Sequence, residues 1–132
     1  MSSALELPAR FNGLFGIVIY HQSHGQLLLR SHDRDDGGPK RLDILFKGVV
    51  WMSLPAWFDS FTIDQCLIDE VVERIPRSLR GKVESRKVFR LDIEGRPHYV
   101  IAGSVLSAGD DGSYFDASPL LSHVEVNLRF DA

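Results

Sequence analysis

Apolar and polar residues alternate in several short stretches of this chain, and alternation with a period of two is typical of half-buried β-strands. Residues 14–20 and 26–30 are apolar runs separated by a polar break that contains Gly25, which predicts a hairpin. The following stretch, 31–40, is rich in Asp and Gly and predicts an exposed loop.

A third strand is predicted at 41–47, and an extended pattern resumes at 49–54. Gly48 separates these two runs, which predicts a bulge that bends the sheet. Within the third strand, the alternation assigns Leu42, Ile44 and Phe46 to the buried face and Asp43 and Lys47 to the exposed face.

The second half of the chain contains a further hairpin. Residues 82–93 and 98–107 alternate on either side of a turn at 94–97. An acidic, Gly-containing loop is predicted at 108–118, and renewed alternation at 123–130 predicts a last strand.

One segment, 62–75, has the periodicity of an amphipathic helix. Thr62 and Gln65 fit a capping box at its start, and Pro76 would end it. Its apolar residues fall within one half of the helix surface: Ile63, Leu67, Ile68, Val71, Val72 and Ile75. A strand is the alternative, because five of these six residues are β-branched. We predict the helix.

These elements together predict an α+β fold, a mainly antiparallel, curved sheet of about six strands with one amphipathic helix packed against it. The connections between most of the elements are local, as they are in antiparallel sheets. A length of 132 residues, with no linker that would divide it, predicts a single domain over residues 1–132.

Composition narrows the classes of function. The formal net charge of −3 argues against a nucleic-acid partner, and no apolar run approaches the roughly 20 residues that cross a membrane. The first residues lack the pattern of a secretion signal, so a cytoplasmic location is expected. The single cysteine, Cys66, excludes an intrachain disulfide, and its acidic neighbours favour a structural thiol over a nucleophile.

The residues that could carry chemistry form no known motif. His21, His24 and His32 are potential metal ligands, but turn histidines are most often surface residues, so no metal is predicted. The sequence contains no nucleophile elbow, phosphate-binding loop or metalloprotease motif, so it predicts no cofactor and no catalytic residue. The basic residues between positions 74 and 90 lack interleaved aromatic residues and are expected to form a solvated surface.

Two segments carry a resemblance to known proteins. Residues 46–52, Phe-Lys-Gly-Val-Val-Trp-Met, and residues 99–103, Tyr-Val-Ile-Ala-Gly, resemble strands of small bacterial single-domain proteins, some of which are similar to toxin-immunity proteins. The resemblance extends over residues 40–106 and carries no functional residue with it. It implies a binding protein that acts by occupying the surface of a partner.

The leading hypothesis is therefore a non-enzymatic interaction protein that neutralises a basic protein partner through acidic surface residues. The exposed face of the predicted helix supplies Asp69, Glu70 and Glu73, and the two Asp-rich loops add further carboxylates.

Two other hypotheses remain open. The first is a β-barrel-like protein that binds a small apolar ligand in a pocket lined by Trp51, Trp57, Phe58 and Tyr99. The second is an enzyme whose carboxylates or histidines are brought together by the fold.

Overall fold

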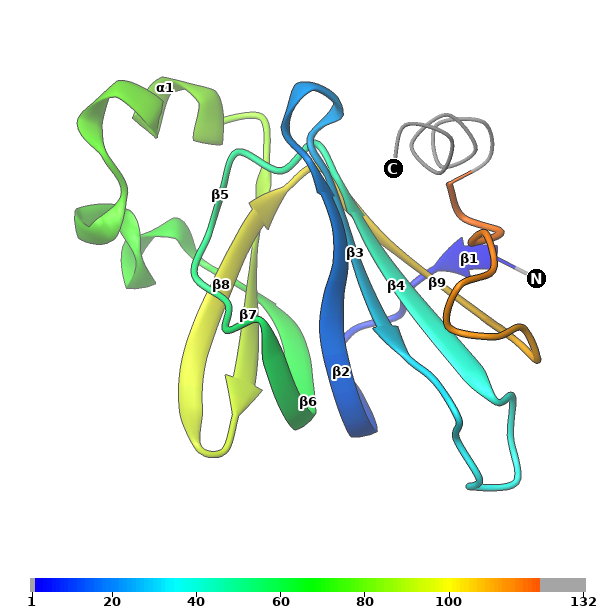
Figure 1. Ribbon diagram of the computed structural model, residues 1–132. Helices are drawn as coiled ribbons and strands as arrows, with labels where there is room; N and C mark the ends of the chain where they lie inside the picture. Colours follow the sequence, from blue (N-terminus) through cyan, green and yellow to red (C-terminus); the bar gives the residue numbers. More distant parts are fainter. Residues whose placement is uncertain (1, 122–132) are drawn as a thin grey trace.

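A single antiparallel sheet dominates the computed structural model, which describes residues 2–121 (Figure 1). Within that range nine strands form the sheet in the order β1-β9-β4-β3-β2-β6-β7-β8-β5. They are β1 (Ser2–Ala4), β2 (Ala9–His21), β3 (Gln26–Ser31), β4 (Arg41–Lys47), β5 (Trp51–Met52), β6 (Trp57–Cys66), β7 (Lys87–Ile93), β8 (Arg96–Ala102) and β9 (Ser104–Asp110). The strand predicted at 123–130 lies outside the described residues.

Both predicted hairpins are confirmed. Strands β2 and β3 pair as the first, and β7 and β8 pair as the second. In the second hairpin, Glu94 and Gly95 both have positive φ and form a two-residue turn, the type whose twist matches that of the flanking strands. The sheet-rich, antiparallel class predicted from the sequence is therefore observed, with more strands than expected.

The sheet bends where two glycines meet. Only Gly103 separates β8 from β9, and Gly48, with a φ of 70°, interrupts β4 and β5 at the same level. The Gly103 amide donates to the Lys47 carbonyl oxygen at 2.8 Å, and strand pairing continues on both sides of this corner. The bend predicted at Gly48 is present, but β4 ends at Lys47 and β5 begins only at Trp51, so a break between two strands produces it and not a bulge within one. This bend folds the sheet round its own core.

The inner face of the folded sheet forms the main core. Alternate residues of its strands point inward and are almost fully buried, including Phe15, Phe46, Phe61, Phe89, Leu27, Leu29, Ile44, Ile63 and Leu91. The rings of Phe15 and Phe61 meet edge to face at 5.2 Å between centroids, a favoured aromatic geometry. Each of these side chains contributes roughly 1.5–3 kcal/mol by leaving water.

The helix predicted at 62–75 is wrong. Residues up to Cys66 belong to β6, in which Thr62 pairs with Asp92 of β7 and Ile63 faces the core. Beyond Cys66 the chain forms three 3-10 turns, Ile68–Glu70, Val72–Arg74 and Arg77–Leu79, followed by α1 (Arg80–Val83), the one α-helix among the described residues. The sheet preference of β-branched residues accounts for the first part alone, because only Ile63 of the five lies in β6. The other four, Ile68, Val71, Val72 and Ile75, lie in the 3-10 turns or at their ends, and Val71 and Ile75 are buried against the sheet.

Residues 67–86, here called the strap, cover the outer face of β7 and β8. The strap and the sheet share a second, smaller apolar cluster, formed by Val71, Ile75 and Val83 against Val88, Tyr99 and Ile101. A polar contact joins the same two layers, because Glu70 accepts a hydrogen bond from Arg90 of β7 at 2.8 Å. The Arg74 guanidinium also lies 5.7 Å from the Trp51 ring and 5.5 Å from the Tyr99 ring.

Two ion pairs occupy the outer face of β3, β4 and β9. Arg30 binds both carboxylate oxygens of Asp43, at 2.7 and 3.0 Å, and both side chains are at most 2% exposed. Arg41 binds Asp110 in the same two-point manner, at 2.7 and 2.6 Å. The prediction that Asp43 lies on an exposed face is therefore wrong.

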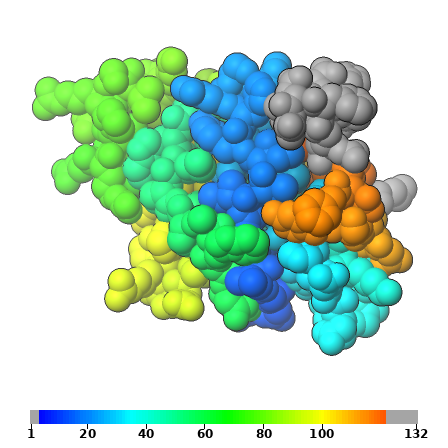
Figure 2. Space-filling model, viewed as in Figure 1, coloured from blue at the N-terminus to red at the C-terminus, as the bar shows by residue number. Residues whose placement is uncertain are grey.

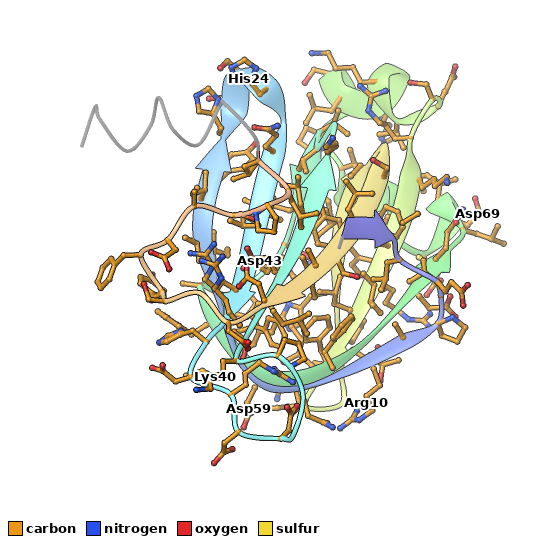
Figure 3. All side chains as sticks on the ribbon, turned by 90° about the vertical axis from the view of Figure 1, so that its right-hand side faces the viewer. Arg10, His24, Lys40, Asp43, Asp59 and Asp69 are labelled. Atoms are coloured by element: carbon orange, nitrogen blue, oxygen red, sulfur yellow. The ribbon has the colours of Figure 1, made fainter. Side chains whose placement is uncertain are left out.

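Asp43 is buried because residues 111–121, here called the cover segment, lie across this face (Figure 3). The two arginines hold the cover segment through its backbone. Arg30 donates to the carbonyl oxygens of Tyr114 and Asp116, and Arg41 donates to those of Ser113, Asp116 and Ala117. Farther along, Leu120 and Leu121 pack on Leu28 and Leu45 and complete a third apolar cluster.

The buried pair predicts a large stability effect. Replacing Asp43 by Ala leaves Arg30 buried without its counter-ion, and loss of one partner of such a pair costs about 3–5 kcal/mol. We expect urea unfolding to detect a decrease of this size. The control is Asp59→Ala, because Asp59 is exposed and lacks an ion pair within the described part of the chain. Equal stability of the two variants would contradict this account.

The second pair predicts a pH effect. The hydrogen bonds from Arg41 hold the pKa of Asp110 below its usual value. The pair therefore stabilises the fold fully above the unfolded-state pKa of about 3.9 and loses its effect as the pH falls through the lower folded-state pKa. Asp110→Asn should cost about 1 kcal/mol at neutral pH, since its side chain is partly exposed. Denaturant titrations should show this difference shrinking below about pH 4; a constant difference would contradict it.

Candidate functional site

The two Asp-rich loops lie side by side at one end of the molecule. Strands β4 and β9 are neighbours, and Arg41 pairs with Asp110 at the end of their ladder. The loops that adjoin this point are linked directly, because the Lys40 amide donates to Asp111 Oδ1 at 3.1 Å. Residues 32–40 and 110–117 are here called the acidic end, and they contain six aspartates and two basic residues.

Asp33 and Asp35 of the acidic end face outward, whereas Arg34 is mostly buried. Arg34 donates to the Asn12 carbonyl oxygen and to Asp36, both at 2.8 Å. The pKa of Asp36 is lowered by a hydrogen bond from the Gly38 amide and by Arg34. The Asp33 side chain is 92% exposed and Asp35 is exposed too, and neither has an Arg or Lys partner among residues 2–121. The surface charge is therefore negative.

Aromatic residues adjoin these carboxylates. The ring of His32 packs against Tyr114 at 4.7 Å, and Tyr114 packs against Phe115 at 5.1 Å between centroids. Phe115 itself is 80% exposed, which is unusual for so large an apolar side chain. Leu14 is 56% exposed and, with residues 31–36, lines a hollow of about 330 Å³ at the same end. The acidic end thus combines exposed carboxylates, exposed apolar groups and a hollow.

The acidic residues predicted on a helix face, Asp69, Glu70 and Glu73, lie on the strap instead. Glu70 is engaged by Arg90 and by the Cys66 thiol, which together lower its pKa. Asp69 and Glu73 are exposed and have no ion pair within the described range. Asp69 lies far from Lys40 of the acidic end (Figure 3), so the fold contains two separate acidic surfaces.

The aromatic residues predicted to line a ligand pocket lie in three different environments. Phe58 belongs to the main core. Trp51 and Tyr99 come together, but under the strap, beside Arg74. Trp57 is 53% exposed and lies against Gly16. Of the four predicted residues, the fold brings together only Trp51 and Tyr99.

The histidines do not converge. His21 and His24 lie at one end of β3 with their rings 4.4 Å apart, whereas His32 follows the other end of that strand. Within residues 2–121 no group of three potential ligands could hold a metal ion.

Sequence reasoning missed Tyr114 and Phe115. The sequence does contain an indication that they are exposed. Two adjacent aromatic residues within a loop of Gly, Asp and Ser have no strand to place them in the core. The contact of Tyr114 with His32 could not be predicted, because it depends on the pairing of β4 with β9.

Comparison of this chain with known proteins identified no relative. No family model, curated protein or solved structure matches this chain. In the described part, no helix has the length and apolar character needed to cross a membrane. The likeness to toxin-immunity proteins therefore stays a prediction.

Cys66 is set up as an unreactive thiol. Burial and a hydrogen bond with Glu70 raise the pKa of Cys66 to about 12. Because of this raised pKa, its thiolate fraction at neutral pH should be about a thousandfold below that of an ordinary cysteine. Only the thiolate reacts, so alkylation should be slower to the same degree. Alkylation by iodoacetamide, followed by mass spectrometry, should be slow in the folded protein and fast in denaturant. Glu70→Gln should accelerate it, and rapid reaction of the native wild type would contradict this prediction.

Proposed function

We propose that this protein is a non-enzymatic interaction protein that binds a basic protein partner through the acidic end. The observation that carries the proposal is the exposed ring of Phe115 on an acidic end whose Asp33 and Asp35 side chains are also exposed. Apolar anchors surrounded by charged groups are characteristic of protein interfaces, where the anchor supplies affinity and the charges supply association rate and selectivity.

The hollow beside Leu14 supports a basic partner in particular. Asp33, Asp35 and Asp36 line it, while the one arginine in its lining already has a carboxylate partner. A lysine or arginine side chain that entered it would meet carboxylates with an apolar wall beside them. Such a site favours a long side chain with an apolar stem and a cationic end.

The way the acidic end is held also supports binding. Two buried arginines fix the backbone of residues 113–117, so the loop that carries Phe115 is attached to the sheet at several points. A surface that is ordered before binding loses less conformational entropy when the partner docks.

The acidic end is favoured over the strap residues Asp69 and Glu73. The second half of the strap, together with Lys87 at the start of β7, is basic. Residues 77–87 hold five basic residues and one acidic residue. These cations reduce the attraction of that surface for a basic partner. The proposed function agrees with the activity that the resemblance to toxin-immunity proteins implies, namely occupation of a partner's surface.

A capture experiment tests the proposal. The full-length protein, carrying an affinity tag, is incubated with extract of its own cells at low and at high salt. We expect a protein with a basic surface to bind at low salt and to be released near 1 M salt, where the screening length falls to about 3 Å. Absence of any such protein at low salt would count against the proposal.

Variants then locate the interface. With the captured protein purified, calorimetry should show that the triple variant Asp33→Asn, Asp35→Asn, Phe115→Ala binds at least about 30-fold more weakly, the effect of losing one strong anchor. These side chains are exposed, so the fold should not change. The matched control, Asp69→Asn with Glu73→Asn, should bind like the wild type. Equal affinity of the triple variant and the wild type would overturn the proposal.

A further inference from the structure

The strap encloses a hollow that plays no part in the proposed function. It lies between the strap and the outer face of β6 and β7. The strap itself is on the opposite side of the molecule from the acidic end (Figures 1 and 2). The volume of the hollow is about 260 Å³.

The inside of the hollow is apolar. Cys66 and Val88 are paired neighbours on β6 and β7 and form the sheet side, and the strap contributes Ile68, Val72, Ile75 and Val83. The Cys66 thiol stays protonated at neutral pH, because burial raises its pKa. This part of the lining therefore carries no charge and resembles the apolar interior of ligand pockets.

The rim of the hollow is cationic. Arg80, Arg86 and Lys87 line it together with one carboxylate, Glu84. Lys87 has no ion pair among the described residues, and Arg80 has a single hydrogen bond, to the Ile75 carbonyl oxygen at 3.3 Å. Leu67, which also lines the hollow, is 75% exposed. An apolar interior, an exposed leucine and unpaired cations thus lie next to one another.

We propose that this hollow binds a small anion with an apolar tail, such as a medium-chain carboxylate. The tail would displace water from Val72 and Val88 and cover Leu67, and the anionic group would lie beside Lys87 and Arg80. The hollow is slightly smaller than the roughly 300–1,000 Å³ pockets of drug-sized ligands, which favours a short tail. Two cationic partners at the rim favour an anion over a neutral head group.

Three probes separate the contributions of tail and charge. Octanoate has both, octanol has the tail without the charge, and acetate has the charge without the tail. Titration calorimetry on the full-length protein should show octanoate binding at least about tenfold more tightly than octanol and acetate. Octanoate should also raise the midpoint of thermal unfolding, because it binds only the folded state. Absence of octanoate binding, or equal binding of octanol, would overturn the proposal.

Two substitutions locate the site. Lys87→Gln should weaken octanoate binding about tenfold, as expected for loss of one charge-assisted contact. The matched control is Lys82→Gln, which removes a cation from α1 that does not line this hollow, and it should leave the affinity unchanged. Both positions are exposed, so both variants should fold. Equal effects of the two substitutions, or none from Lys87→Gln, would overturn the assignment. The Phe115→Ala variant should bind octanoate normally, which separates this site from the acidic end.

Discussion

The meeting of Gly48 and Gly103 is the constraint on which the shape of this protein depends. A Cβ atom on Gly48 would lie 3.3 Å from the Gly103 nitrogen, and one on Gly103 would lie 3.4 Å from the Lys47 carbonyl oxygen. Neither position therefore has room to spare for a side chain. Because both strands bend here, a strand that pairs with β7 continues as one that pairs with β4. The sheet encloses its core, and its outer faces become available to other segments.

Two non-strand segments cover those outer faces, and each is held by apolar packing combined with arginine. The cover segment depends on Arg30 and Arg41, whose charges are balanced by Asp43 and Asp110 and whose remaining N–H groups bind backbone carbonyl oxygens. An arginine is suited to this position because its planar group can bind a carboxylate at two points and still donate elsewhere. The strap depends on Val71 and Ile75, with Arg90 and Arg74 at its edge.

Local patterns in the sequence predicted the parts of the fold that depend on neighbours in the chain. The hairpins and the bend at Gly48 are of this kind. The pattern failed at 62–75, where apolar spacing fitted a helix and only the β-branched residues indicated a strand. It also failed at Asp43, because alternation shows which residues share a face but not whether a segment 70 residues later covers that face. For the same reason, the Asp-rich loops were visible from the sequence, but their contact with each other, through His32 with Tyr114 and Lys40 with Asp111, was not.

The net charge of −3 conceals two surfaces of opposite sign. Arg41 and Asp110 neutralise each other, and the carbonyl groups that Arg41 binds carry no formal charge, so the outward aspartates determine the field at the acidic end. Residues 77–87 have the opposite sign, because they hold five basic residues and one acidic residue, and Lys87 has no counter-ion in the described structure. Charges separated by more than the roughly 8 Å screening length at physiological salt act independently. The two surfaces can therefore attract different ligands, a basic protein at one and a small anion at the other, without weakening each other.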